Sequence, residues 1–136
     1  MELEPITNHR SLPTFAGRSL GITVLVSVQS LVGVIHVLFG LWLLSASNSN
    51  YLYSVYTTVF GLTTLFFTLG FWKGKTCGWF GTVATLLFVT VADALTLFNL
   101  PSIPGIPRFA AFAEIAYSIL LLLYLFQAQA RAKARF

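Results

Sequence analysis

Long stretches without charged residues decide what this sequence can fold into. The runs at 20–44 and 52–72 contain no Asp, Glu, Lys or Arg, the run at 79–100 contains only Asp93, and the run at 109–130 contains only Glu114. A helix that crosses the hydrocarbon core of a bilayer needs about 20 predominantly apolar residues. The sequence therefore predicts an all-α protein in which these four runs form a four-helix transmembrane bundle.

The composition also indicates a lipid environment. Hydrophobic residues make up 57% and charged residues 9% of the chain, compared with about 45–50% and about 25% in an ordinary soluble domain. So few charges cannot cover the surface of a soluble protein, whereas a lipid-facing surface needs none. The net charge of +4 comes from short basic clusters beside apolar runs, so nucleic acid is not expected as a partner.

The basic residues indicate how the predicted helices are oriented. With an even number of spans, a polar tail (1–18), a turn with Lys73 and Lys75, and a basic tail (131–136) lie on one side of the membrane, and they hold every Lys and Arg except Arg108. Short loops rich in Lys and Arg stay in the cytoplasm. Because short connections make neighbouring spans antiparallel, residues 19–130 are predicted to form an up-down-up-down bundle with both termini cytoplasmic.

Each predicted span carries a stripe of small or polar residues, which membrane helices use to pack closely. Spacings of four and three residues place the members of a stripe on one helix face. The stripes are Gln29, Gly33, His36 and Gly40; Thr57, Gly61, Thr64 and Thr68; Gly81, Thr85, Phe88 and Ala92, with Asp93 and Thr96 alongside; and Ala110, Glu114, Tyr117, Leu121 and Tyr124. We expect these faces to line the interior of the bundle.

Three titratable side chains within the spans are candidates for chemistry: His36, Asp93 and Glu114. With a helical rise of about 1.5 Å per residue, they lie roughly 12, 10 and 8 Å from the outer ends of their predicted spans, in one layer. A charged side chain costs about 2.5–3.5 kcal/mol at the centre of a membrane helix, so such residues are functional candidates. The pattern predicts an intramembrane polar cluster, with Gln29, Arg108 and Tyr117 as secondary members.

Two interpretations of this cluster are open. In the functional one, it forms a small polar site, open toward the outer face, that binds a cation or relays a proton between imidazole and carboxyl groups. In the structural one, His36 hydrogen-bonds a carboxyl group and fixes the helix register. Arg108 could reach down to either carboxylate from its loop, although its spacing from Glu114 along the sequence is unfavourable for a pair within one helix.

The sequence gives less support to a metal site, a haem site or cysteine redox chemistry. One imidazole and two carboxylates are a suitable set of metal ligands, but each comes from a different helix and no ligand spacing indicates a site. Haem with two axial ligands is not expected, because His9 lies in the tail and leaves His36 alone. A single cysteine, Cys77, excludes an intrachain disulfide and a CxxC redox pair. We therefore expect a non-enzymatic protein without a metal or cofactor.

The segment at 69–79, Leu-Gly-Phe-Trp-Lys-Gly-Lys-Thr-Cys-Gly-Trp, resembles the central turn of small, uncharacterised bacterial and archaeal four-span membrane proteins. In those proteins a second helix ends in a G-x-W-K-G-K-x-x-x-W turn, and the Leu-Tyr-Leu at 123–125 is also similar. In size and layout they are broadly like the DoxX group, some of which are linked to respiratory or sulfur-oxidising complexes. The resemblance covers residues 61–136 and implies four helices in a prokaryotic plasma membrane, with no activity attached.

The sequence leaves two functions open. The first is a non-enzymatic accessory subunit or small membrane factor, because the loops are too short to build an extramembrane active site. Its partners would be the lipid bilayer and either a larger membrane complex or further copies of the chain. The second is a small proton- or cation-coupled transporter or channel that uses Asp93 and Glu114.

Overall fold

The computed structural model describes residues 20–46 and 50–134, and this part of the chain contains four α-helices and no strand. The helices are α1 (Leu20–Ser45), α2 (Tyr51–Trp72), α3 (Thr76–Leu97) and α4 (Arg108–Ala134). All four are long and apolar enough to cross a membrane, which confirms the prediction of an all-α fold with four membrane-length helices. The predicted N-terminal tail and the last two residues lie outside the described residues.

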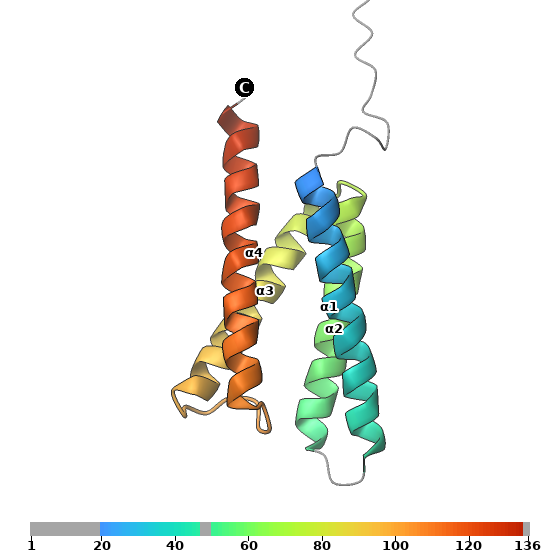
Figure 1. Cartoon of the computed structure of the whole chain (residues 1–136), viewed down its shortest axis with the longest axis vertical. Coiled ribbons are helices and arrows are strands. Elements are labelled where there is room, and N and C mark those ends of the chain that lie inside the picture. The colour runs from blue at the N-terminus through green and yellow to red at the C-terminus, as the bar shows by residue number, and fades with distance from the viewer. Residues whose placement is uncertain (1–19, 47–49, 135–136) are drawn as a thin grey trace, which may run out of the picture.

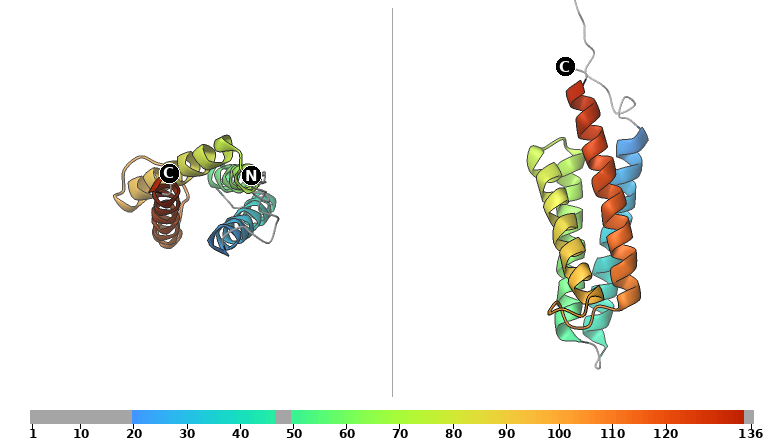
Figure 2. Two further views of the ribbon diagram at one scale, coloured as in Figure 1. Left: turned by 90° about the horizontal axis from the view of Figure 1, so that it is seen from above. Right: turned by 90° about the vertical axis from the view of Figure 1, so that its left-hand side faces the viewer.

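The helices form an open arc. Each helix packs along the next one in the sequence, and the ribbon reverses direction from one helix to the next (Figure 1). Seen from above, α2 and α3 form the back of the arc, and α1 and α4 lie at its two ends (Figure 2). α1 and α4 do not pack along their lengths. They meet through side chains, since His36 contacts Glu114 and Leu25 joins a buried cluster that includes Leu121.

Glycine residues allow backbone contact between α1 and α2. A Cβ atom added at Gly61 would lie 2.7 Å from the carbonyl oxygen of Gly33 and 2.7 Å from the amide nitrogen of Val37. A Cβ atom at Gly40 would lie 2.7 Å from the amide nitrogen of Thr58. Helices surrounded by lipid associate through such close packing, because lipid tails are as apolar as the helices themselves. The glycines of the first two predicted stripes therefore lie in the α1–α2 interface.

Local signals in the sequence set the start of two helices. Asn50 precedes α2, and its side-chain oxygen accepts a 3.2 Å hydrogen bond from the amide of Leu52, which satisfies a donor that the helix leaves unpaired. Pro107 precedes α4, and its carbonyl accepts the amide of Ala111 at 3.0 Å. Proline suits this position because its fixed φ angle matches the first turn of a helix.

α3 lies three residues closer to the N-terminus than the predicted span at 79–100. It begins after a tight turn in which Gly74 adopts a φ of 70°, a conformation that glycine reaches without steric cost. Beyond its other end, Asn99 adopts a left-handed φ of 56°, and Pro101 follows, which cannot continue a helix. Asp93 consequently lies roughly 6 Å from the end of its helix, rather than roughly 10 Å.

The predicted stripe of the third span is wrong at Phe88, whose ring is 61% exposed on the outer surface. The buried residues of α3 include Gly81, Ala92 and Asp93 of that prediction, and the remaining ones are Gly78, Thr82, Val83, Leu86 and Val89. Residue size and spacing alone predicted that the face of the helix containing Phe88 lines the interior of the bundle. α3 packs against both α2 and α4, and this double contact sets the rotation of the helix about its axis.

We expect Gly61→Ala to destabilise the fold by about 1–3 kcal/mol, because the new methyl group would overlap backbone atoms of α1. The loss can be measured by unfolding the purified protein in mixed micelles of a mild detergent and SDS, followed by circular dichroism. Leu62→Ala is the control, since Leu62 is adjacent to Gly61 but 54% exposed. Equal stability of Gly61→Ala and the unmodified protein would contradict the close packing.

Candidate functional site

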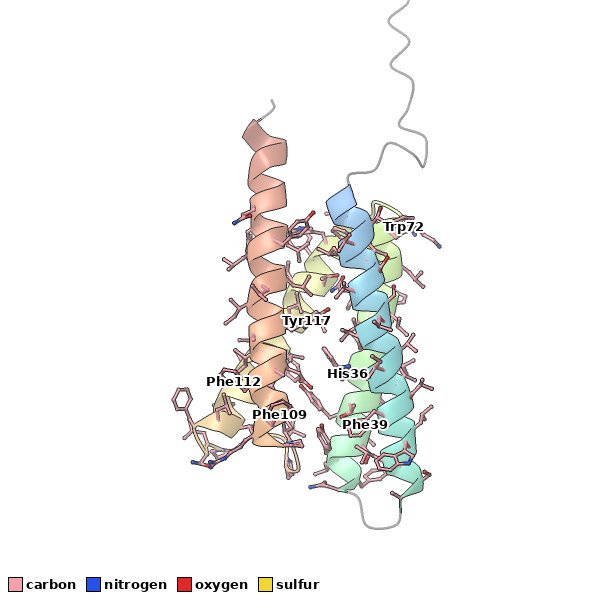
Figure 3. The ribbon with its side chains drawn as sticks, in the orientation of Figure 1. His36, Phe39, Trp72, Phe109, Phe112 and Tyr117 are labelled. Atoms are coloured by element: carbon pink, nitrogen blue, oxygen red, sulfur yellow. The ribbon has the colours of Figure 1, made fainter. Side chains whose placement is uncertain are left out.

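His36 projects from α1 toward α4 and is held by three helices (Figure 3). Its Nδ1 atom lies 2.8 Å from the carbonyl oxygen of Val32 in α1. Its Nε2 atom lies 3.3 Å from Oε1 of Glu114 in α4. The ring of Phe60 in α2 packs edge-on against the imidazole, with 4.8 Å between ring centroids. The structure therefore brings two of the predicted site residues, His36 and Glu114, into direct contact.

The contact with Val32 decides which ring nitrogen carries a proton. A carbonyl oxygen can only accept a hydrogen bond, so Nδ1 of His36 must donate one and be protonated. Nε2 then has two arrangements with Glu114. It accepts a hydrogen bond from a protonated carboxyl group, or it donates one to a carboxylate as part of an imidazolium. In both arrangements Nε2 and Glu114 share one proton.

Asp93 lies on α3 and is completely buried, with 0% of its surface exposed. Neither of its carboxyl oxygens has a hydrogen-bond partner among the described residues. The carboxyl group of Glu114 lies within electrostatic range of Asp93. Glu114 therefore interacts both with His36 and with Asp93. Two carboxylates surrounded by lipid repel each other strongly unless at least one of them holds a proton.

Two tyrosine residues of α2 belong to the same cluster and were missed by the sequence analysis. Tyr53 and Tyr56 interact electrostatically with Asp93 and Glu114, and the hydroxyl group of Tyr56 is buried without a hydrogen-bond partner. Their depth in the membrane could have indicated this. Both tyrosines lie within two turns of the start of α2, and Glu114 lies within two turns of the start of α4. Tyrosine is common near membrane surfaces, so depth alone did not distinguish these two.

Apolar side chains pack together at the end of the helices next to the α3–α4 loop. Ile106 of the loop is buried and packs with Tyr53 and Ala111. The opening toward this end that the functional interpretation includes stays a prediction, since Ile106 also lines a cavity of about 350 Å³ between the loop and the end of α3. The side chains of His36 and Glu114 are 18% and 20% exposed. The pair that joins α1 and α4 is thus the partly exposed part of the cluster, whereas Asp93 is buried.

Further buried hydroxyl groups, which have no hydrogen-bond partner among the described residues, lie on α2, α3 and α4 at levels between the cluster and the opposite end of the helices. This hydroxyl row consists of Tyr56, Thr64, Thr82, Tyr117 and Ser118. Thr64 lies roughly 12 Å from Tyr56 along α2, and Thr82 lies roughly 16 Å from Asp93 along α3. Buried polar groups are nearly always hydrogen-bonded, and interior water is their partner where the protein offers none. The hydroxyl row therefore has the polarity to bind water along the interior.

The secondary candidates lie at the margin of the cluster or outside it. Gln29 is buried at another level, where its side-chain oxygen accepts a 3.4 Å hydrogen bond from the hydroxyl of Thr68. Tyr117 lies one turn from Glu114 and belongs to the hydroxyl row (Figure 3). Arg108 hydrogen-bonds the side chain of Asn99 at the surface. The expectation that Arg108 reaches a carboxylate is therefore wrong, because the turn at Asn99 offers its guanidinium a nearer partner.

Within the described ranges, no group of three His, Cys, Asp or Glu side chains is arranged to hold a metal ion. The chemistry that the geometry does offer is proton exchange between the imidazole of His36 and the carboxyl group of Glu114, which are hydrogen-bonded. No protein family, curated protein or solved structure matches this chain. The interpretation of the site therefore rests on its geometry.

We expect His36 to be protonated at Nδ1 in both of its charge states, because the carbonyl of Val32 requires a donor there. Nitrogen-15 NMR of histidine-labelled protein can test this in a His9→Asn variant, which leaves one histidine signal. Glu114→Gln should change the Nε2 resonance and leave Nδ1 protonated. A neutral ring with the proton on Nε2 would contradict the geometry.

Proposed function

We propose that this chain is a non-enzymatic multi-pass membrane protein that moves protons through the cluster of His36, Glu114 and Asp93. One observation carries the proposal: titratable side chains from three helices meet, and one of them is a fully buried carboxyl group without a hydrogen-bond partner. Such a carboxyl group is costly in a membrane, and a proton-binding role accounts for its presence beside an imidazole.

The proposed path begins at the His36–Glu114 pair, whose side chains are partly exposed between α1 and α4. A proton bound at Nε2 of His36 passes to Oε1 of Glu114 across the 3.3 Å hydrogen bond. A bound water would carry it from Glu114 to Asp93, whose carboxyl oxygens have no hydrogen-bond partner among the described residues. Nδ1 keeps its proton on the carbonyl of Val32, so the ring exchanges protons through Nε2 alone. Water bound along the hydroxyl row would carry the proton onward toward the α2–α3 turn.

The proposal includes an orientation in the membrane. The helices form an up-down-up-down bundle in a prokaryotic plasma membrane, with both termini and the turn containing Lys73 and Lys75 in the cytoplasm. The distribution of Lys and Arg supports this orientation, and the resemblance to small DoxX-like four-span proteins supports the type of membrane. The cluster then lies in the outer leaflet, and protons move from it toward the cytoplasmic end.

A second proposal, an accessory subunit of a larger membrane complex, is favoured by the open arc. Among the described helices, α1 packs along α2 only, and α4 packs along α3 only. The exposed side of the His36–Glu114 pair lies between α1 and α4. A helix of a partner protein or of a second copy would cover this pair and could hydrogen-bond to it. The two proposals differ in whether the chain alone moves protons.

In liposomes that contain a pH-sensitive dye, we expect the purified protein to dissipate an imposed pH gradient. Glu114→Gln and Asp93→Asn should slow the decay to that of protein-free liposomes, because each removes a titratable group while keeping the size of the side chain. Thr90→Val is the matched control and should retain the original rate. Thr90 lies one turn from Asp93, and its hydroxyl already donates a 2.8 Å hydrogen bond to the carbonyl of Leu86.

Two outcomes would contradict proton movement through the cluster. If the unmodified protein decays no faster than empty liposomes, the chain alone does not move protons, and the accessory role is favoured. If all three variants retain the original rate, protons pass by a route that does not include the carboxyl groups. Circular dichroism of each variant confirms that it is folded before its rate is compared.

The cysteine of the basic turn tests the proposed orientation. Cys77 is exposed and is the one cysteine in the sequence. We expect a membrane-impermeant maleimide to label it only after the cells are permeabilised, because the turn is placed in the cytoplasm. A Cys77→Ser/Leu100→Cys variant is the control, since Leu100 is 52% exposed beyond the opposite end of α3 and should be labelled in intact cells. Labelling of Cys77 in intact cells would reverse the orientation.

A further inference from the structure

A cavity of about 450 Å³ lies at the end of the helices opposite the proton cluster, between α1, α4 and the α2–α3 turn. Its walls are mostly apolar and include Ile22 of α1, Leu125 of α4 and Phe71 of α2. The volume falls within the range of about 300–1,000 Å³ that is typical of pockets for small organic ligands. The proposed proton path does not account for an apolar cavity at this position.

The mouth of this cavity is positively charged. Lys75 lines the cavity and precedes the first residue of α3, and its side chain does not cap the helix. The first amide groups of a helix have no partners within it and form the positive end of the helix dipole. Thr76 adds a hydroxyl group at the same point. Asp93, the acidic residue of α3, lies roughly 25 Å away along the helix, so it does not neutralise this charge.

Two tryptophan residues indicate the depth of the cavity in the membrane. Trp72 and Trp79 lie on either side of the turn, and both line the cavity; Trp72 is labelled beside the turn in Figure 3. Indole rings prefer the headgroup layer of a bilayer. The cavity therefore extends from the headgroup layer, where Lys75 lies, into the apolar region, where the exposed side chain of Phe80 lines it.

We propose that this cavity binds an anionic phospholipid, with its phosphate group at Lys75 and the first turn of α3 and an acyl chain along the apolar side chains of Ile22 and Phe80. A zwitterionic lipid offers the same chain but brings its own positive group to a site that is already positive. A soluble phosphate compound offers the charge but leaves the apolar walls unfilled. Basic pockets between transmembrane helices bind anionic headgroups in this way. The proposal is independent of proton movement.

Quenching of tryptophan fluorescence tests this site in reconstituted liposomes. The chain has three tryptophan residues, and Trp42→Phe leaves only Trp72 and Trp79, which both line the cavity. In this variant, brominated phosphatidylglycerol should quench the fluorescence at a mole fraction about fivefold lower than brominated phosphatidylcholine does, as expected for one additional lysine–phosphate interaction. Adding Lys75→Gln should abolish this preference.

Lys73→Gln is the matched control, because Lys73 belongs to the same basic turn but does not line the cavity. It should retain the preference for phosphatidylglycerol. Equal quenching by both lipids in the Trp42→Phe protein would overturn the proposal. Equal loss of preference in the two lysine variants would also overturn it, since a general attraction of the turn for anionic membranes would then suffice. Displacement of the brominated lipid by inorganic phosphate would assign the cavity to a soluble ligand instead.

Discussion

The hydrogen bond between His36 and Glu114 is the interaction on which the interior of this protein depends. α1 and α4 lie at the two ends of an open arc and do not pack along each other. Near the opposite end of the helices they meet through Leu25 and Leu121, so at the polar end the hydrogen bond is what joins them. The 3.3 Å contact joins them at the level of Asp93. The imidazole of His36 and the carboxyl group of Glu114 find no equally good partner in hydrocarbon, so they stay together. Their hydrogen bond brings α1 and α4 to the polar site that also includes Asp93 of α3 and the tyrosines of α2.

Magnitudes support a functional role for this site over a structural one. A charged side chain costs about 2.5–3.5 kcal/mol at the centre of a membrane helix, whereas a hydrogen bond between membrane helices contributes about 0.6 kcal/mol on average. Asp93 is buried without any hydrogen bond in return. An apolar residue at position 93 would therefore make the fold more stable. The tight packing of Gly33 against Gly61 shows that α1 and α2 associate closely without a titratable group.

The parts of this structure that follow from local rules could be predicted, and those that follow from contacts between helices could not. Charge-free runs determine the four helices, because lipid requires every backbone group to be paired within its own segment. The constant helical rise then predicts that His36, Asp93 and Glu114 lie at similar depths. Rotation of a helix about its axis is set by its neighbours, so Phe88 was placed on the wrong face. The choice of Asn99 as the partner of Arg108 depends on a turn that spacing does not reveal.

The two ends of the molecule have opposite chemistry, and this arrangement links the two proposals. Titratable acids lie at one end, and the basic turn with its cavity lies at the other. A proton that moves along the hydroxyl row approaches the uncompensated charge of Lys75 and the positive end of α3, which together raise its electrostatic energy. An anionic phosphate bound at Lys75 would cancel this charge and lower the barrier to exit. If both proposals hold, proton movement should be faster in membranes that contain anionic lipid, and Lys75→Gln should remove this dependence.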